Sequence, residues 1–277
     1  MILLNVTRMK QLIRLMGVLF ACSALATGAF AGTEVYSGKE SKAVAPAPPP
    51  ACDYTWTGFY IGANGGYGWG NADTNFDPLP DAASFFSIEP ITLSPDPSGF
   101  IGGGQVGFNW QMNHWFVAGL EADFQGSDME GTEHQSPIID ITGSPNSSGT
   151  FIHAHERTQW FGTVRARLGI DLACRWLFYV TGGLAYGNVD YYADTNFQDQ
   201  GGPFYLSAFD KTKAGWTVGG GTEYALSNHW SVKAEYLYYD LGNESDTAPA
   251  SDGRPFAMHY NWDTTAHIVR GGLNFKF

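Results

Sequence analysis

Apolar and polar residues alternate along eight consecutive segments of this chain, and this period of two limits its fold more than any other feature. Such alternation is typical of β-strands, because successive side chains point to opposite sides of a sheet. The 47 positions assigned to one face, which end at Tyr238 in the seventh segment, include no Asp, Glu, Lys or Arg. The chain is therefore predicted to be all-β. The segments are 57–69, 100–110, 115–124, 159–170, 176–188, 216–226, 230–241 and 265–277.

The opposite face of the same segments carries charged residues. This is notable because only 15% of the chain is charged, whereas soluble domains average about a quarter. The aromatic content of 15% argues against disorder. The net charge of −12 is spread without a basic patch, so nucleic acid is not an expected partner. The charged positions are Glu121, Asp123, Arg165, Arg167, Glu223, Lys233, Glu235, Arg270 and Lys276.

The connections between the segments distinguish two all-β folds. A β-sandwich would alternate in the same way, but its connections would be short at both ends. Here, tight turns near residues 113, 174 and 228 alternate with much longer connections. Short turns on one side and long loops on the other are typical of an outer-membrane barrel. We therefore predict an eight-stranded antiparallel up-and-down transmembrane barrel over residues 55–277. The long connections are 70–99, 125–158, 189–215 and 242–264.

The nine tryptophans agree with this fold, because all fall at or near the ends of the segments. Tryptophan is enriched at membrane–water interfaces, where its ring sits among the lipid headgroups. We therefore expect them to form interfacial girdles rather than a buried core.

The N-terminus predicts an exported protein. Residues 1–31 combine a basic start, a short apolar run and Ala29-Phe30-Ala31, which is a small-x-small cleavage pattern. The apolar run is too short for a membrane anchor, and lipoprotein processing at Cys22 is the remaining alternative. Residues 32–54 follow as a linker, rich in proline and alanine, that we expect in the periplasm.

Segments 56–62, 179–187 and 235–242 carry motifs of glycine and aromatic residues, and the first of them begins the first strand. They resemble the first strand and later strands of small alphaproteobacterial outer-membrane barrel proteins, often grouped as porin-family or OmpA-type barrels. The C-terminus, with Gly272, Phe275 and Phe277, resembles the signal read by the outer-membrane assembly machinery. The resemblance implies an outer-membrane surface protein. Members of the family are linked to envelope integrity, immune recognition and, in some, haemin binding.

An eight-stranded barrel has an interior about wide enough to be filled by its own side chains. Four acidic and four basic residues are predicted to face this interior, and buried charges persist only when they are paired. We expect Glu121 and Asp123 to meet the arginines of the next strand, and Glu223 to meet Lys233. The network is expected to plug the barrel, and the alternative is a narrow or gated pore for small solutes.

Within the long connections, residues 71–98, 127–156, 190–211 and 242–263 together carry eighteen acidic and two basic residues. They are expected to form an acidic, solvated surface. A second interpretation is that their carboxylates bridge to lipopolysaccharide through divalent cations. Membrane lipid, lipopolysaccharide and the assembly machinery are the expected partners, and we expect a monomer.

Other chemistry has weaker support. His153 and His155 are the only dense ligand pair, as weak candidates for metal or haemin, so neither a metal nor a cofactor is expected. No nucleophile, base and orienting group fall together in the sequence, so no enzyme activity is expected. Cys52 and Cys174 are both placed at the periplasmic end, either as one disulfide or as two free thiols.

Overall fold

In a computed structural model of the chain, the described residues are 54–79, 90–140, 143–146, 149–197 and 201–277. The expected signal peptide and all of the expected linker except Tyr54 lie outside them. Within the described residues there is no helix long and apolar enough to cross a membrane. The strands are β1 (Gly58–Leu79), β2 (Ile91–Leu93), β3 (Ser98–Gln111), β4 (Phe116–Gln135), β5 (Phe151–Asp171), β6 (Trp176–Asn196), β7 (Phe204–Ala225), β8 (Trp230–Pro249) and β9 (Ala257–Lys276).

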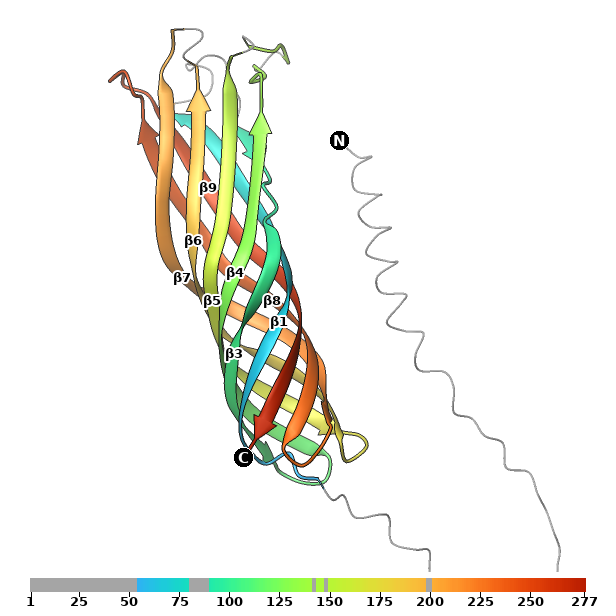
Figure 1. Cartoon of the computed structure of the whole chain (residues 1–277). Coiled ribbons are helices and arrows are strands. Elements are labelled where there is room, and N and C mark those ends of the chain that lie inside the picture. The colour runs from blue at the N-terminus through green and yellow to red at the C-terminus, as the bar shows by residue number, and fades with distance from the viewer. Residues whose placement is uncertain (1–53, 80–89, 141–142, 147–148, 198–200) are drawn as a thin grey trace, which may run out of the picture. The chain divides into compact units, whose positions relative to one another are not determined.

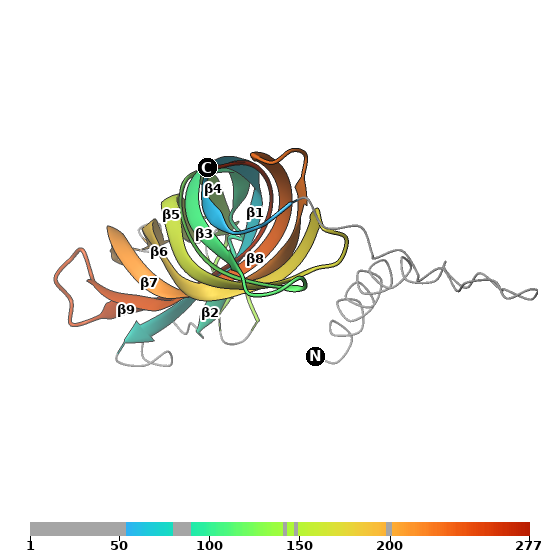
Figure 2. The ribbon, with the colours of Figure 1, turned by 90° about the horizontal axis from the view of Figure 1, so that it is seen from below.

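Eight of these strands close into a ring, in which each strand pairs antiparallel with its neighbours. The order runs from β1 through β3 to β9, and β9 returns to pair with β1 from Tyr60↔Lys276 to Leu79↔Ala257. The short β2 pairs only with the far end of β1. Figure 1 shows the long strands running obliquely, and Figure 2 shows the ring from below. The predicted eight-stranded up-and-down barrel is confirmed.

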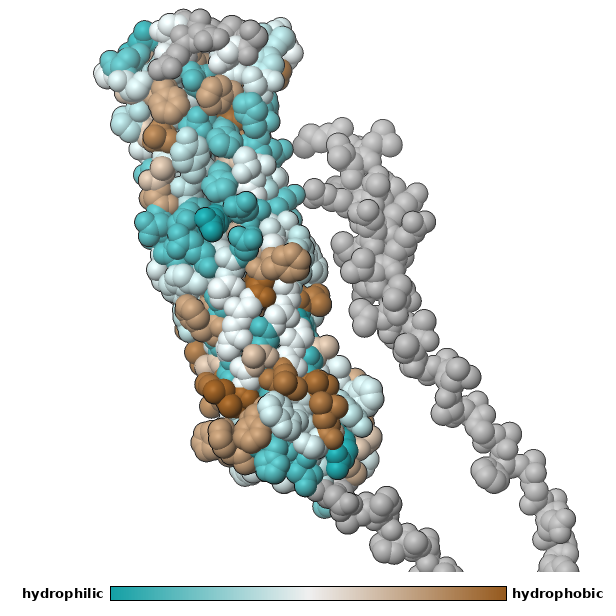
Figure 3. Space-filling view, in the orientation of Figure 1, coloured by the Kyte–Doolittle hydropathy of each residue, from teal (hydrophilic) through white to brown (hydrophobic). Residues whose placement is uncertain are grey.

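The half of the barrel that contains the C-terminus has apolar residues outside and polar residues inside. Two aromatic girdles bound this region, which we call the membrane band. The upper girdle includes Trp69 stacked on His267, and Phe124 stacked on Trp160. The lower girdle includes Phe59 against Phe108. On the face shown in Figure 3, apolar residues gather mainly in the lower half of the barrel. An apolar outer band between aromatic girdles is typical of a surface that faces lipid.

Beyond the upper girdle the strands continue much further than the sequence segments predicted. Most of the residues expected in long loops are strand, and we call this region the outer half. Its polarity is reversed, since on β1 Asn71 and Asp73 point outward while Ala72 and Phe76 are buried. The outward face here meets water, so apolar side chains are stable only inside. They form one core cluster that includes Phe161, Tyr191, Tyr239, Leu241, Tyr260 and Trp262.

The ring of backbone hydrogen bonds is interrupted at two places in the outer half. Pairing between β7 and β8 ends at Trp216↔Asp240. There β8 has an irregularity between Asp240 and Asn243, at which Gly242 adopts a φ of 72°. Glycine adopts this left-handed conformation without steric cost. On the other side, β3 begins only at Ser98, and the preceding segment fills the space, where the Pro97 carbonyl accepts a bond from the Gly70 amide.

The lower mouth of the barrel is covered by the segment before β1. Tyr54 and Trp56 are buried in a small cluster with Leu177 and Tyr179. The Trp56 indole donates a hydrogen bond of 3.1 Å to Asp171. The expectation that all nine tryptophans lie at the interfaces is therefore wrong for Trp56 and for Trp262, which is buried in the core of the outer half.

Candidate functional site

The candidate site is the set of charged side chains inside the membrane band. The alternation of each strand turns these residues inward, because their sequence neighbours are the apolar residues that face lipid. All eight are buried, with side-chain exposures of 0–3%. They come from β4 (Glu121, Asp123), β5 (Arg165, Arg167), β7 (Glu223), β8 (Lys233, Glu235) and β9 (Arg270).

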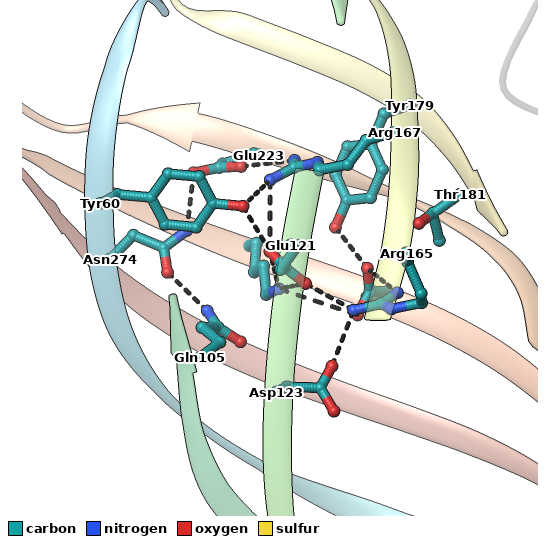
Figure 4. A network of polar contacts seen from close by, with 12 residues as sticks. Tyr60, Gln105, Glu121, Asp123, Arg165, Arg167, Tyr179, Thr181, Glu223 and Asn274 are labelled. Carbon is teal, nitrogen blue, oxygen red and sulfur yellow. Dashed lines mark hydrogen bonds and ion pairs between the residues drawn. The ribbon is translucent and has the colours of Figure 1, made fainter. Parts of the chain in front are cut away.

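Arg165 contacts three carboxylates at once. Its guanidinium lies 2.5 Å from Glu121, 2.9 Å from Asp123 and 3.0 Å from Glu235. Arg270 joins the same group from β9, at 2.8 Å from Asp123 and 2.6 Å from Glu235. Charged groups in a low-dielectric interior need such multiple partners to offset the loss of hydration. This part of the network therefore links four strands across the lumen. Figure 4 shows Arg165 with Glu121 and Asp123.

A second part of the network is centred on Arg167. Its guanidinium lies 2.8 Å from Glu223 and bonds the Tyr60 hydroxyl, which in turn donates to Glu121 at 2.7 Å. The Tyr179 ring lies beneath the same guanidinium, with 4.0 Å between the charged carbon and the ring centroid. A cation over an aromatic face is stabilised by the quadrupole of the ring. Arg167 is thus held by charge, hydrogen bonding and aromatic contact together.

One expected pair does not form. Glu223 and Lys233 occupy directly opposed positions of β7 and β8, but the Lys233 ammonium lies 2.9 Å from Glu121 across the lumen. The long lysine side chain reaches the centre of the barrel, where Glu121 is fully buried. Glu223 instead accepts bonds from Arg167, Ser231 and Asn274.

Sequence reasoning missed the uncharged members of the network. Tyr60, Gln105, Thr163, Tyr179 and Asn274 all bond to the charged groups or to one another. Each lies on the inward-facing side of its strand, so the alternation itself was the available signal. The resulting lumen is filled by four acidic and four basic residues that neutralise one another.

The histidine candidates lie outside the barrel wall, in the outer half. His153 contacts Asp194 at 3.1 Å, and its ring centroid is 6.3 Å from that of His134. His155 bonds the Thr132 hydroxyl at 2.8 Å. Among the described residues, no group of three or more His, Cys, Asp or Glu side chains could hold a metal ion.

The remaining candidates lie at the lower end of the barrel. Cys174 is disulfide-bonded, while Cys52 lies outside the described residues. Phe277, the last residue of the assembly motif, is 76% exposed, and its amide bonds the Phe59 carbonyl at 3.0 Å. Phe275 packs on Trp230, whereas Gly272 lies close to the Lys233 side chain.

Many acidic residues predicted on the outer surface are there, but Glu156 is not. It is fully buried inside the outer half, because the register of β5 shifts between Thr158 and Trp160 and turns it inward. On the surface, two pairs of aspartates occupy directly opposed positions of neighbouring strands. They are Asp73 with Asp263, and Asp190 with Asp210.

Comparisons with known proteins identify the family. The family model of the outer membrane protein beta-barrel domain matches residues 42–277. A 31 kDa outer-membrane immunogenic protein of Brucella melitensis is 39% identical over 239 residues, covering 86% of this chain and 90% of that protein. A 22 kDa outer membrane protein of Rhizobium leguminosarum is 29% identical over 235 residues, covering 84% of this chain and 82% of that protein. The crystal structure of OprG from Pseudomonas aeruginosa is 12% identical, with a TM-score of 0.45, over 81% of this chain and 99% of that one. The resemblance seen in the motifs is thus confirmed: the chain belongs to the outer-membrane beta-barrel domain family, and the protein lies in the bacterial outer membrane.

Proposed function

We propose that this protein is a non-conducting structural barrel that presents a folded, acidic outer half at the cell surface. The observation that carries the proposal is the filled lumen, whose eight charged side chains are 0–3% exposed and bonded to one another. The apolar core of the outer half lies above this network and adds a second obstacle to solutes. We infer no enzyme activity and no cofactor.

Single-channel recording tests the proposal. The full exported chain is refolded into a planar bilayer, and a general porin of known conductance is recorded in parallel. We expect no steady conductance, since an ion would have to separate pairs such as Arg165–Glu121. A gel that compares unheated and boiled samples shows that the tested protein is folded. A reproducible open state in folded protein would replace the plug with the narrow-pore function.

The surface role is supported by the two aspartate pairs of the outer half. Asp73 lies four residues beyond the girdle residue Trp69, and Asp263 four residues before His267, so the first pair sits just above the membrane band. Opposed carboxylates repel each other, and a divalent cation suits such oxygen ligands. We propose that these pairs bind anionic lipopolysaccharide through Mg²⁺ or Ca²⁺.

Removal of the cation tests this partner. Lipopolysaccharide binding to detergent-solubilised protein is measured with Mg²⁺ and again after chelation by EDTA. We expect binding to fall on chelation, and to fall likewise in the Asp73→Asn/Asp263→Asn variant. The control is Asp128→Asn on β4. Asp128 is exposed, but the neighbouring strand β3 contains no aspartate that could form a pair with it. Unchanged binding in EDTA would exclude cation bridging.

The relative that is named an immunogenic protein supports exposure of this protein at the cell surface. We further propose that it is a monomer, that it binds no nucleic acid, and that Phe277 takes part in its assembly into the membrane.

A further inference from the structure

In the outer half, the seam between β7 and β8 has no backbone ladder and is held mainly by side chains. No backbone pairing links these strands beyond Trp216↔Asp240. Gly215 is the residue next to this last pair. It has no space for a side chain, because a Cβ there would overlap the Asp240 carbonyl oxygen. Beyond it, β8 stays paired with β9 and β7 stays paired with β6. Both strands therefore present an unpaired edge at the seam.

Polar contacts close the seam at successive heights. Lys213 donates a bond of 2.6 Å to the Gly242 carbonyl. Lys211 lies 2.5 Å from Glu244. Above them, the Ser207 hydroxyl donates to Asp246 at 2.5 Å. At the far end, the amide and carbonyl of Phe204 exchange bonds with Ser251.

These contacts separate the apolar core of the outer half from the solvent. Phe209, on β7, is only partly buried and packs against the core, where its ring lies 5.4 Å from that of Trp262. Opening the seam would expose this side of the core just above the membrane band. The strength of a few side-chain bonds therefore decides whether the outer half is closed.

Glu156 lies behind this seam and is fully buried. Within the described part of the chain neither of its carboxyl oxygens accepts a well-formed hydrogen bond, and the Thr264 hydroxyl on β9 is the polar side chain near enough to favour its ionised form by hydrogen bonding. Its cross-strand neighbours are Gly131 on β4 and Tyr191 on β6. The Lys213 ammonium lies 5.6 Å from the centre of the Tyr191 ring, on the same side of the core.

The charged groups that act on Glu156 come from two other strands. Lys213, on β7, favours its ionised form, and Asp263, on β9, opposes it. The titratable Tyr239 faces it from β8. Lys213 is itself influenced by Glu244 and Lys211 at the seam. Burial has the largest effect and raises the pKa of the Glu156 carboxyl to about 8, because the apolar surroundings do not solvate the charge.

We propose that the β7–β8 seam is a latch through which the outer half opens sideways, and that Lys213 couples this latch to Glu156. While Glu156 is neutral, the Lys213 ammonium holds the Gly242 carbonyl. When Glu156 releases its proton to solvent, the Thr264 hydroxyl can donate to the buried carboxylate, but within the described residues the charge that acts to neutralise it is this ammonium. Either Lys213 turns toward it or Glu156 moves out to water, and the seam loses its lowest bond in both cases.

The direction of the pH effect follows from linkage. In the open form Glu156 meets water, and its pKa returns toward the ordinary value near 4.5. The closed form binds the proton more tightly, so a rise in pH favours opening. The open population is expected to increase by up to roughly tenfold per pH unit between pH 5 and pH 8, and to level off above that.

Hydrogen exchange measured by mass spectrometry on the full exported chain in lipid nanodiscs tests the latch. Rates are divided by the intrinsic amide rate at each pH. We expect protection of residues 204–215 and 243–249 to fall by more than tenfold between pH 5.5 and 8.5. Residues 185–195 of β6 are bonded on both sides and should keep their protection. Seam protection that is independent of pH, or equal to that of β6 throughout, would overturn the proposal.

Three variants assign the effect to the named residues. Glu156→Gln keeps the shape of the neutral carboxyl and should abolish the pH dependence of seam protection. If protection in this variant falls with pH as steeply as in the unmodified protein, the coupling is contradicted. Lys213→Gln should lower protection at every pH. Lys211→Gln should lower protection but retain the pH dependence. If Glu156→Gln does not fold, a disulfide between Ser207→Cys and Asp246→Cys replaces it as the test. This cross-link should remove the pH-dependent loss of seam protection in the otherwise unmodified chain, and a loss that persists would contradict the latch.

Discussion

Arg165 on β5 and Glu121 on β4 occupy directly opposed positions of the barrel wall, and their charged groups lie 2.5 Å apart inside it. The strand register therefore determines which opposite charges meet at this position. The same guanidinium also contacts Asp123 and Glu235, so one arginine offsets the burial of three carboxylates.

Replacing Arg165 should be among the most destabilising changes in the membrane band. Arg165→Ala leaves these carboxylates without their main partner, and loss of one member of a buried ion pair costs about 3–5 kcal/mol. Urea unfolding in lipid vesicles measures the loss. Lys211→Ala is the matched control, because that lysine is 52% exposed and exposed pairs contribute less than about 1 kcal/mol. Similar losses in both variants would contradict the role given to burial.

Two adjacent glycines on β3 should respond oppositely to the same substitution. Gly103 faces the lumen, where a Cβ would overlap the carbonyl oxygen of Phe124. Gly104 faces lipid, and the nearest atom to its Cβ would be 3.6 Å away. We expect Gly103→Ala to reduce the refolded fraction, as judged by gel mobility before and after boiling, and Gly104→Ala to leave it unchanged. Normal refolding of the Gly103→Ala variant would contradict the close approach of β3 and β4 at this position.

Trp56 should stabilise the lower mouth in two separable ways. Trp56→Phe removes the hydrogen bond to Asp171, and a bond to a charged group contributes about 1.5–3 kcal/mol. Trp56→Ala also removes the buried ring, and such truncations cost about 3–5 kcal/mol. Unfolding in urea should therefore rank the unmodified protein above Trp56→Phe, and Trp56→Phe above Trp56→Ala. Equal stability of the last two would show that the ring contributes little.

The stability of the outer half should decrease as pH rises. Glu156 binds its proton more tightly in the folded state, where its pKa is about 8, than in the unfolded chain, where it is near 4.5. Its contribution is full below about pH 4.5 and is lost as pH rises through 8. The limit is about 5 kcal/mol at 1.36 kcal/mol per pKa unit. Urea unfolding at pH 5 and pH 8 measures the change, and Glu156→Gln should make it smaller. If the Glu156→Gln variant shows the same difference in stability between pH 5 and pH 8 as the unmodified protein, Glu156 is not the cause of the pH dependence.

Removal of the C-terminal aromatic ring should affect assembly more than stability. Phe277 is largely exposed, so Phe277→Ala should leave urea unfolding of the refolded protein nearly unchanged. Its level in the outer membrane of cells should fall, because the assembly motif is altered. Leu226→Ala, at another exposed apolar position, is the control for apolar surface. Normal levels of the Phe277→Ala protein in cells would exclude this role.

The alternation by itself determined the barrel and the inward direction of its charges. A strand in lipid cannot place Arg165 or Glu223 outward without a large desolvation cost, so residue type and parity were sufficient within the membrane band. The same parity placed all eight charged residues in the lumen. It did not determine their partners, since Lys233 bypasses the opposed Glu223 and reaches Glu121 across the barrel.

Beyond the membrane band, the tertiary structure decided what the sequence pattern left ambiguous. The sequence pattern predicts that Asn71 and Asp73 are loop residues, because a strand whose outward face is polar and meets water lacks the apolar residues that mark a lipid-facing strand. Only the closure of the strands around a common interior places Phe76 and Trp262 in one core. The register shift on β5 is likewise a product of strand pairing, and it moves Glu156 from the expected surface into that core. Local alternation specifies which side chains share a face, whereas the choice between water, lipid and core for that face depends on where the whole barrel places it.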